Sequence, residues 1–332
     1  MEIRQLMYNF DVKELSSADM SLWDALVDQS PHGTLFHKSG WLTACARSLG
    51  QKIRIFGCYH DGVLVGGCSL FIDRKKGFVP VASSTCTLTP YGGVILSIAP
   101  STSVHKRETW YRQIIFSLID YIESERFFLI SIRNSPDFPD IRPFTLNGWK
   151  STVFYAYYID LTNNFESKYD SSLKRNIRKA EKNHLIFEPF SDISRYYALF
   201  CDTYTRKNKK PPVPKHLFTE LYSFIRDQNC GEMVVAKTTD DEIACVEIVI
   251  WDGKQAFSWS AASDFRFLTS GASSFIMNEY MKRLKDRGIP KINIMMANIP
   301  ELSSMATSFN PTLRPYYEVK STIFNNLLSG RR

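Results

Sequence analysis

The sequence predicts a mixed α/β protein in which two domains repeat one order of elements. Its 332 residues exceed one ordinary domain, since about 150 residues per domain is usual. Hydrophobic residues make up 44% and charged residues 23% of the chain, a balance typical of folded globular proteins. Each half contains paired strands, then a helix, then a closing strand, so we expect an internal repeat.

The first repeat begins with a hairpin. Residues 53–59 and 63–72 are apolar runs, and Asp61-Gly62 between them is typical of a tight hairpin turn. A third strand is expected over residues 78–82, followed by a loop.

A helix and a closing strand complete the first repeat. The helix is expected over residues 104–124 and the strand over residues 127–132. One face of the helix carries apolar residues at helical spacing: Trp110, Ile114, Leu118 and Ile122.

The second half repeats this order. Strands are expected over residues 233–237, 243–251 and 255–261, with turns between them. A helix over residues 272–287 follows, and a strand over residues 291–295 closes the unit.

Three further helices are expected between the two repeats, over residues 172–183, 193–207 and 215–227. The boundary between the two domains is expected near Asn147-Gly148, before this helical region. We therefore expect an N-terminal domain of residues 1–148 and a C-terminal domain of residues 149–332, and the latter includes the helix 172–183.

Several classes of protein are disfavoured by what the sequence lacks. The seven cysteines are scattered and odd in number, so we expect reduced thiols and a cytoplasmic location. The six histidines lack metal-ligand spacing, so no metal cofactor is expected. No apolar run approaches the roughly 20 residues of a transmembrane helix. Phosphate-loop and dinucleotide-binding glycine motifs are missing as well.

Cations gather on one side of the helix 172–183, opposite an apolar side. These cations include Lys174, Arg175, Arg178 and Lys179. Only Glu181 offers an acidic partner at helical spacing, so pairing within the helix does not account for the cluster. The cluster is either a solvated helix face or a binding site for phosphate or pyrophosphate. The net charge of +7 is too diffuse to indicate DNA binding.

A second candidate anion site precedes the helix 272–287. It consists of Arg266, Thr269, Gly271, Ala272 and Ser273. A helix N-terminus carries free N–H groups and a partial positive charge, and glycine lets a phosphate approach the backbone. The alternative is an ordinary strand-to-helix loop in which Ser273 caps the helix.

Glu247 interrupts the apolar run of residues 243–251. Such a run suggests a strand buried on both faces, where a carboxylate either has a partner or is protonated with a raised pKa. A raised pKa suits a general base for an amine. In the alternative, the strand lies at an edge and Glu247 faces water.

The segment Thr89-Pro90-Tyr91-Gly92-Gly93 is a loop whose glycines allow a tight turn and a close approach of the backbone. Tyr91 either forms part of a substrate-binding wall or packs on the core. No nucleophile motif of the Gly-x-Ser-x-Gly type is present.

Five segments, taken in order, resemble the GNAT superfamily in its tandem form, and Fem-type peptidyltransferases in particular. They are residues 34–42, 89–93, 172–180, 260–263 together with 271–272, and 309–317. The sequence departs from the family pattern at two positions. Thr269 stands where the pyrophosphate loop usually has its first glycine, and Ala306 stands where Fem-type enzymes often have a lysine.

The resemblance implies two tandem GNAT-like domains, each with a central mixed sheet flanked by helices, and acyl transfer to an amine. Glu247 would accept the amine proton, Tyr316 or Tyr317 would protonate the leaving group, and main-chain N–H groups would hold the oxyanion. The donor would be acyl-CoA, bound at residues 266–273, or alternatively aminoacyl-tRNA.

The implied acceptor is an anionic small molecule or a lipid-linked precursor of the cell envelope, bound by the basic helix and Tyr91. Two alternatives stay open. One is an aminoacyl-tRNA-dependent peptidyltransferase of peptidoglycan-type precursors, with tRNA as a partner. The other is a degenerate, non-catalytic GNAT pair that binds an anionic ligand or a partner protein. The sequence does not define the oligomeric state.

Overall fold

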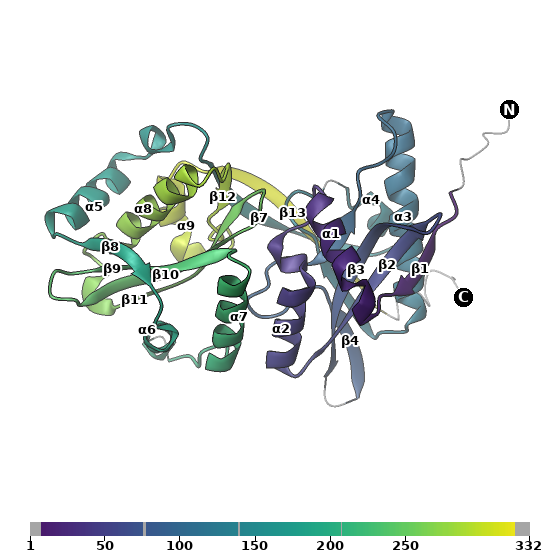
Figure 1. The fold of residues 1–332 in the computed structure, drawn as a ribbon, viewed down its shortest axis with the longest axis horizontal. Coiled ribbons are helices and arrows are strands. Elements are labelled where there is room, and N and C mark those ends of the chain that lie inside the picture. The colour runs from purple at the N-terminus through teal and green to yellow at the C-terminus, as the bar shows by residue number, and fades with distance from the viewer. Residues whose placement is uncertain (1–7, 76–77, 139, 207, 323–332) are drawn as a thin grey trace. The chain divides into compact units, whose positions relative to one another are not determined.

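The computed structural model is a mixed α/β fold, which confirms the fold class expected from the sequence (Figure 1). It describes residues 8–75, 78–138, 140–206 and 208–322. The chain forms two compact units, and each consists of a mixed sheet with helices packed on it.

Unit 1 comprises Met1–Phe154 and Pro315–Arg332, and unit 2 comprises Tyr155–Arg314. The expected domains divide the chain once, at residue 148, whereas the chain passes between the compact units twice. The second passage lies within the last strand, β13 (Thr312–Thr322), most of which belongs to unit 1 because it pairs with β6 of that unit.

The sheet of unit 1 has the strand order β1-β2-β3-β4-β6-β13, and β5 pairs with β3. Neighbouring strands are antiparallel except for the parallel pair β4 and β6. The hairpin between β2 and β3 turns at Asp61 and Gly62, whose φ angles of 48° and 78° suit a tight hairpin turn. The bounds are Asp11–Glu14 for β1, Lys52–His60 for β2, Val63–Lys75 for β3, Val79–Ser83 for β4, Gly93–Leu96 for β5 and Leu129–Arg133 for β6.

Helices cover both faces of this sheet. A Cβ added at Gly66 of β3 would meet Ile114 of α3, and one added at Gly67 would meet Trp23 of α1. Because neighbouring residues of a strand point to opposite faces, α3 and α1 lie on opposite sides of the sheet. The helices are α1 (Met20–Gln29), α2 (Ser39–Leu49), α3 (Val104–Ser124) and the short α4 (Arg142–Leu146).

The sheet of unit 2 has the strand order β8-β9-β10-β11-β12-β7. Its neighbours are antiparallel except for the parallel pair β11 and β12. The bounds are Lys150–Asp160 for β7, Ile186–Phe190 for β8, Gly231–Lys237 for β9, Ile243–Trp251 for β10, Ala256–Ser263 for β11 and Lys291–Asn293 for β12.

Two layers of helices surround β9, β10 and β11. Helix α8 packs on β9 and β10 and is itself covered by α5 (Figure 1). Helix α6 packs on β11, and α7 packs on β9. The helices are α5 (Ser171–Lys182), α6 (Ile193–Thr205), α7 (Lys215–Asp227), α8 (Ala272–Asp286) and α9 (Pro300–Ser308).

The two sheets share one topology. Each sheet begins with four antiparallel strands. A helix then connects to a fifth strand that is parallel to the fourth, and a sixth, antiparallel strand closes the sheet. In unit 1 the helix is α3 and the closing strand is β13; in unit 2 they are α8 and β7. Strand β7 follows β6 in the chain yet closes unit 2, and β13 comes after β12 yet closes unit 1.

Candidate functional site

Two of the predicted anion-binding features meet in unit 2, where α5 packs on α8. Gly271 is the N-cap of α8 with a φ of 87°, and a Cβ there would lie 2.2 Å from the backbone oxygen of Asn176 on α5. The Nζ of Lys179 donates a hydrogen bond of 2.6 Å to the carbonyl oxygen of Thr269. The basic helix therefore borders the loop that leads into α8.

The orientation of α5 follows from its sequence. Asp170 caps its N-terminus by accepting a hydrogen bond of 2.8 Å from the N–H of Leu173. The apolar side of the helix, which consists of Leu173, Ile177 and Ala180, is buried in the core of unit 2. The opposite, basic side is therefore turned away from the core.

Two of these cations are free to bind a ligand. Arg175 and Arg178 are exposed, and neither makes a side-chain hydrogen bond or ion pair with a residue that the structure describes. Lys174 and Lys179 instead donate to backbone carbonyl oxygens. An anion at α5 would therefore be held chiefly by the two arginines.

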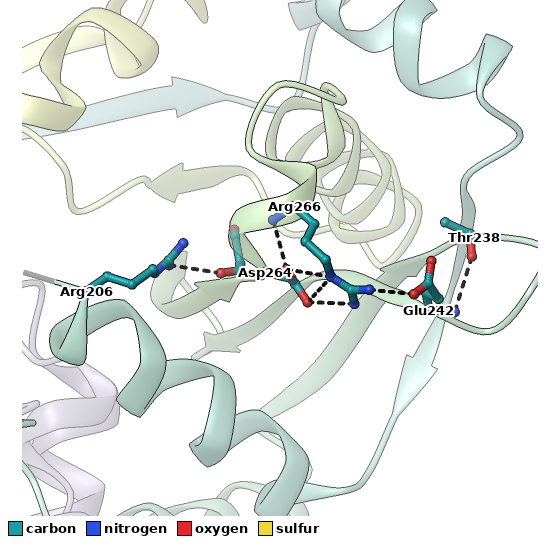
Figure 2. Close-up of polar contacts among 6 residues, drawn as sticks. Arg206, Thr238, Glu242, Asp264 and Arg266 are labelled. Carbon is teal, nitrogen blue, oxygen red and sulfur yellow. Dashed lines mark hydrogen bonds and ion pairs between the residues drawn. The ribbon is translucent and has the colours of Figure 1, made fainter.

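Arg266 is placed differently, as Figure 2 shows. Its guanidinium lies 2.9 Å from an oxygen of Asp264 and 2.6 Å from an oxygen of Glu242. The hydrogen bonds from Arg266 also lower the pKa of Asp264. A donor pyrophosphate would have to compete with two carboxylates for Arg266.

The start of α8 does not use Ser273 as a cap. The N-cap is Gly271, and the N–H of Ala272 donates to the hydroxyl of Ser270 at 3.2 Å. The hydroxyl of Ser273 lies 3.4 Å from that of Ser263 on β11. Serine hydroxyls thus surround the first turn of α8, where the helix dipole favours negative charge.

Glu247 lies in the middle of β10, which is buried along its whole length between β9 and β11. This excludes the alternative of an edge strand facing water. The side chain is 2% exposed, and its Oε1 accepts a hydrogen bond from the hydroxyl of Ser258 on β11. Burial raises the pKa of Glu247 to about 7, although the hydrogen bond from Ser258 acts in the opposite direction.

Tyr280 of α8 is a second buried polar group near this carboxyl. Burial, and next the negative charge of Glu247, raise the pKa of Tyr280 well above its usual value. Its hydroxyl makes no hydrogen bond of ordinary geometry within the described chain. Glu247 therefore lies in a small polar group inside an apolar core and can exchange a proton near neutral pH.

The strands β11 and β12 separate next to this group. They pair only at Ala256 with Ile292 and at Phe257 with Asn293. From Ser258 to Ser263, β11 has no ladder partner on that side among the residues described. The hydrogen bond between Ser258 and Glu247 is thus formed where the sheet opens.

The tyrosines predicted for the site belong to unit 1, whereas Glu247 belongs to unit 2. Tyr91 is only 2% exposed, and its ring centroid lies 6.0 Å from that of Phe36 and 5.1 Å from that of Tyr316. These contacts are those of the structural alternative, in which Tyr91 packs on the core.

Tyr316 and Tyr317 point to opposite faces of β13, because they are neighbours in a strand. Tyr316 is buried and stacks on Phe154, with ring centroids 5.6 Å apart. Tyr317 is half-buried and lines a cavity beside α3 and α4. One site can therefore include only one of the two hydroxyls.

Ser258 and Tyr280 are candidate site residues that the sequence did not reveal. Tyr280 belongs to the apolar stripe of its helix, and nothing in the spacing of Ser258 distinguishes it from other strand serines. Both become visible only through their position beside Glu247 in the folded chain.

The raised pKa of Glu247 predicts a pH-dependent stability. The folded chain retains this proton up to about pH 7, whereas the unfolded chain releases it near the ordinary pKa of 4.5. Stability is therefore lost as pH rises through this window, by about 3 kcal/mol. Glu247→Gln should remove this loss, so urea unfolding should show the variant gaining stability relative to the wild type from pH 4.5 to pH 8. An equal pH dependence of both proteins would contradict the assignment.

Two further searches of the structure concern metals and membranes. Within the described ranges there is no group of three or more His, Cys, Asp or Glu residues that could hold a metal ion. None of the helices in these ranges is long and apolar enough to cross a membrane.

Residues 167–300 match the family model described as "Acetyltransferase (GNAT) domain". The matched segment contains α5, Glu247, Ser258 and the loop before α8. No curated protein matches the chain. Residues 167–300 are therefore similar to a GNAT acetyltransferase domain, which supports N-acyltransferase activity.

Solved structures extend this likeness to most of the chain. FemX superposes with a TM-score of 0.72 at 11% identity, covering 96% of this chain and 99% of FemX. The C-terminal domain of a proposed lysylphosphatidylglycerol synthetase from Agrobacterium fabrum gives 0.58 at 12% identity, with 94% and 95% covered. A tandem GNAT protein from the clavulanic acid biosynthesis pathway gives 0.55 at 9% identity, with 95% and 98% covered. The chain thus has a tandem GNAT fold of the Fem-like type, as the sequence resemblance predicted.

Proposed function

We propose that the protein transfers an acyl group, acetyl or aminoacyl, from a thioester or ester to the amine of an anionic acceptor of the cell envelope. The observation that carries this proposal is the buried Glu247, whose pKa of about 7 suits a general base at neutral pH. It lies within the matched GNAT segment, where β11 and β12 separate. The names of two similar structures, FemX and a lysylphosphatidylglycerol synthetase, favour an envelope-related acceptor.

In the proposed reaction, Glu247 accepts a proton from the acceptor ammonium, directly or through water. The free amine attacks the acyl carbonyl carbon, and main-chain N–H groups hold the oxyanion that forms. Collapse of this intermediate breaks the bond to the thiolate or alkoxide, which takes a proton from Tyr316 or Tyr317. The former amine nitrogen loses its remaining extra proton as the amide forms, and this proton restores the tyrosine. The environment of Glu247 supports this role, because the carboxyl is shielded from water and is held by Ser258.

Phosphates of the donor or acceptor have two candidate positions. The first is the N-terminus of α8, at Gly271, Ala272 and Ser273, where the pyrophosphate of acyl-CoA would meet the positive end of the helix dipole. The second is the pair Arg175 and Arg178 on α5, whose side chains are exposed and make no hydrogen bond or direct ion pair with the described residues, although the charge of Arg175 acts on Asp170. The second position is favoured for the acceptor or for tRNA, since Arg266 beside the first is held by two carboxylates.

One experiment separates the donors. The purified protein is incubated with an amine panel and either radiolabelled acetyl-CoA or radiolabelled aminoacyl-tRNA, and label in the amine products is counted. Transfer from CoA supports acyl-CoA as the donor, and transfer from tRNA supports the peptidyltransferase alternative. If neither donor gives labelled product while the protein still binds pyrophosphate, the proposed catalysis is wrong and the alternative of a degenerate, non-catalytic GNAT pair is supported.

The role of α5 gives a prediction that does not require the donor. Replacing Arg175 and Arg178 by alanine should weaken the binding of inorganic pyrophosphate by about tenfold, because two charge-assisted contacts are lost. The loss should be larger at low salt than at high salt, because salt screens exposed charges. Isothermal titration calorimetry at two salt concentrations checks both statements. The matched control is Lys209→Ala with Lys210→Ala, two exposed cations removed from a loop of the same unit. If both double variants weaken pyrophosphate binding equally, the effect comes from the net charge of the protein and not from a site at Arg175 and Arg178.

A further inference from the structure

A cavity in unit 1 lies outside the residues of the proposed donor and acceptor sites. Its volume is about 560 Å³, and it is bordered by α3, α4 and β13. Pockets for small organic ligands typically measure about 300 to 1,000 Å³. The apolar lining consists of buried side chains from four positions: Leu96, Ile115, Phe138 and Pro143.

Three arginines and two carboxylates border the cavity. Arg142 lies 2.8 Å from an oxygen of Asp140 and 3.4 Å from an oxygen of Glu108, so its charge is compensated by both carboxylates. Arg107 and Arg112 have no side-chain hydrogen bond or ion pair with any other described residue. The charge of Arg112 nevertheless acts on Asp140: burial raises the pKa of that carboxyl, whereas hydrogen bonds from Arg142 and then the charges of Arg142 and Arg112 lower it. Two exposed guanidinium groups without a direct ion pair therefore lie beside an apolar lining.

The geometry of α3 places these groups together. Arg107 and Tyr111 are one turn apart on the helix, and Arg112 follows Tyr111 directly. The N–H of Ala99 donates to the Tyr111 hydroxyl at 3.2 Å, which fixes the half-buried ring at the edge of the cavity. Tyr317 adds a second half-buried ring to the lining. Aromatic rings and buried aliphatic side chains favour a flat or apolar ligand group.

We propose that this cavity binds a small organic phosphate. The phosphate is held by Arg107 and Arg112, because guanidinium groups bind phosphate oxygens through paired, charge-assisted hydrogen bonds. The apolar part of the ligand lies against Tyr111 and the buried lining. A soluble phosphate ester and the head group of an anionic phospholipid share this chemistry. The cavity uses none of the residues assigned to phosphate binding in the proposed acyl transfer, and it shares with that proposal only Tyr317, one of the two candidate acids.

The test uses phenyl phosphate, which combines one phosphate with one flat ring. Isothermal titration calorimetry of the full chain should show binding of phenyl phosphate, weaker binding of inorganic phosphate and no binding of benzyl alcohol. Arg107→Gln with Arg112→Gln should weaken the binding of phenyl phosphate by about tenfold or more. Lys106→Gln is the matched control, because Lys106 is an exposed cation of the same helix that does not line the cavity.

A second arm distinguishes the two sources of the phosphate. Sedimentation with phosphatidylglycerol vesicles is compared with sedimentation with phosphatidylcholine vesicles. If phenyl phosphate binds and the binding requires the two arginines, the ligand is a soluble phosphate ester. If phosphatidylglycerol vesicles bind through the arginines but phenyl phosphate does not bind, the ligand is a lipid head group. Equal binding of every probe by the wild type and by the folded double variant overturns the proposal. So does a loss in Lys106→Gln as large as that in the double variant.

Discussion

Replacing Glu247 by glutamine should reduce acyl transfer by about 100- to 10,000-fold, the usual contribution of a general base. Glutamine keeps the shape of the side chain and can still accept the hydrogen bond from Ser258, but it cannot take a proton from the amine. The measurement is the turnover of the purified protein with the donor found in the radiolabel assay. Wild-type turnover should rise with pH around pH 7, where Glu247 ionises, and the variant should lack this rise.

Two further variants show whether this effect is specific. Ser258→Ala removes a hydrogen bond that lowers the pKa of Glu247, so the rise in turnover should move to higher pH while activity is retained. Glu181→Gln changes an exposed carboxylate of α5 and should leave turnover unchanged. A fully active Glu247→Gln protein would exclude Glu247 as the base.

Replacing Gly271 by alanine should destabilise the fold by about 4 kcal/mol, a large effect for one methyl group. The new Cβ would lie 2.2 Å from the backbone oxygen of Asn176, and a backbone atom cannot turn away as a side chain can. The φ of 87° adds strain for any residue with a side chain. Urea unfolding monitored by circular dichroism measures the change in the free energy of unfolding.

Two other glycines of unit 2 serve as controls that separate the loss of stability caused by the backbone contact from the loss caused by the positive φ angle. Gly288 has a φ of 78° but nothing within 4 Å of its added Cβ, so Gly288→Ala should lose about 1 kcal/mol from backbone strain alone. Gly253 has open space and no left-handed φ, so Gly253→Ala should be nearly neutral. If Gly271→Ala loses no more than Gly288→Ala, the contact between α5 and α8 is looser than the structure indicates.

The contact at Gly271 also changes the interpretation of this glycine. The sequence suggested that Gly271 lets a phosphate approach the backbone, but the structure shows α5 in direct contact with it. The absent side chain is therefore required by helix packing, whatever ligand binds. Because α5 carries Arg175 and Arg178, a substitution that displaces α5 should weaken pyrophosphate binding as well.

Local patterns were enough to predict the elements with strong periodicity. The helix 104–124 coincides with α3, because Trp110, Ile114, Leu118 and Ile122 recur at helical spacing and all four are buried. The hairpin at Asp61-Gly62 follows from the preference of these residues for positive φ angles. Segments with weaker patterns were missed: β5 formed where a loop was expected. Seven other elements were not predicted as helices or strands: β1, β7, β8, β13, α1, α4 and α9.

The sequence by itself determined the mixed α/β class, the repeated order of elements, the basic face of α5 and the presence of a carboxylate in the apolar strand β10. These properties depend on spacing along the chain, which hydrophobic burial converts directly into helices, strands and faces. The tertiary structure alone decided which strand closes each sheet, because β7 and β13 pair with partners far away in the sequence. It likewise decided that Ser258 and Tyr280 lie beside Glu247 and that Arg266 is held by two carboxylates. Such contacts join separate elements, so no local pattern encodes them.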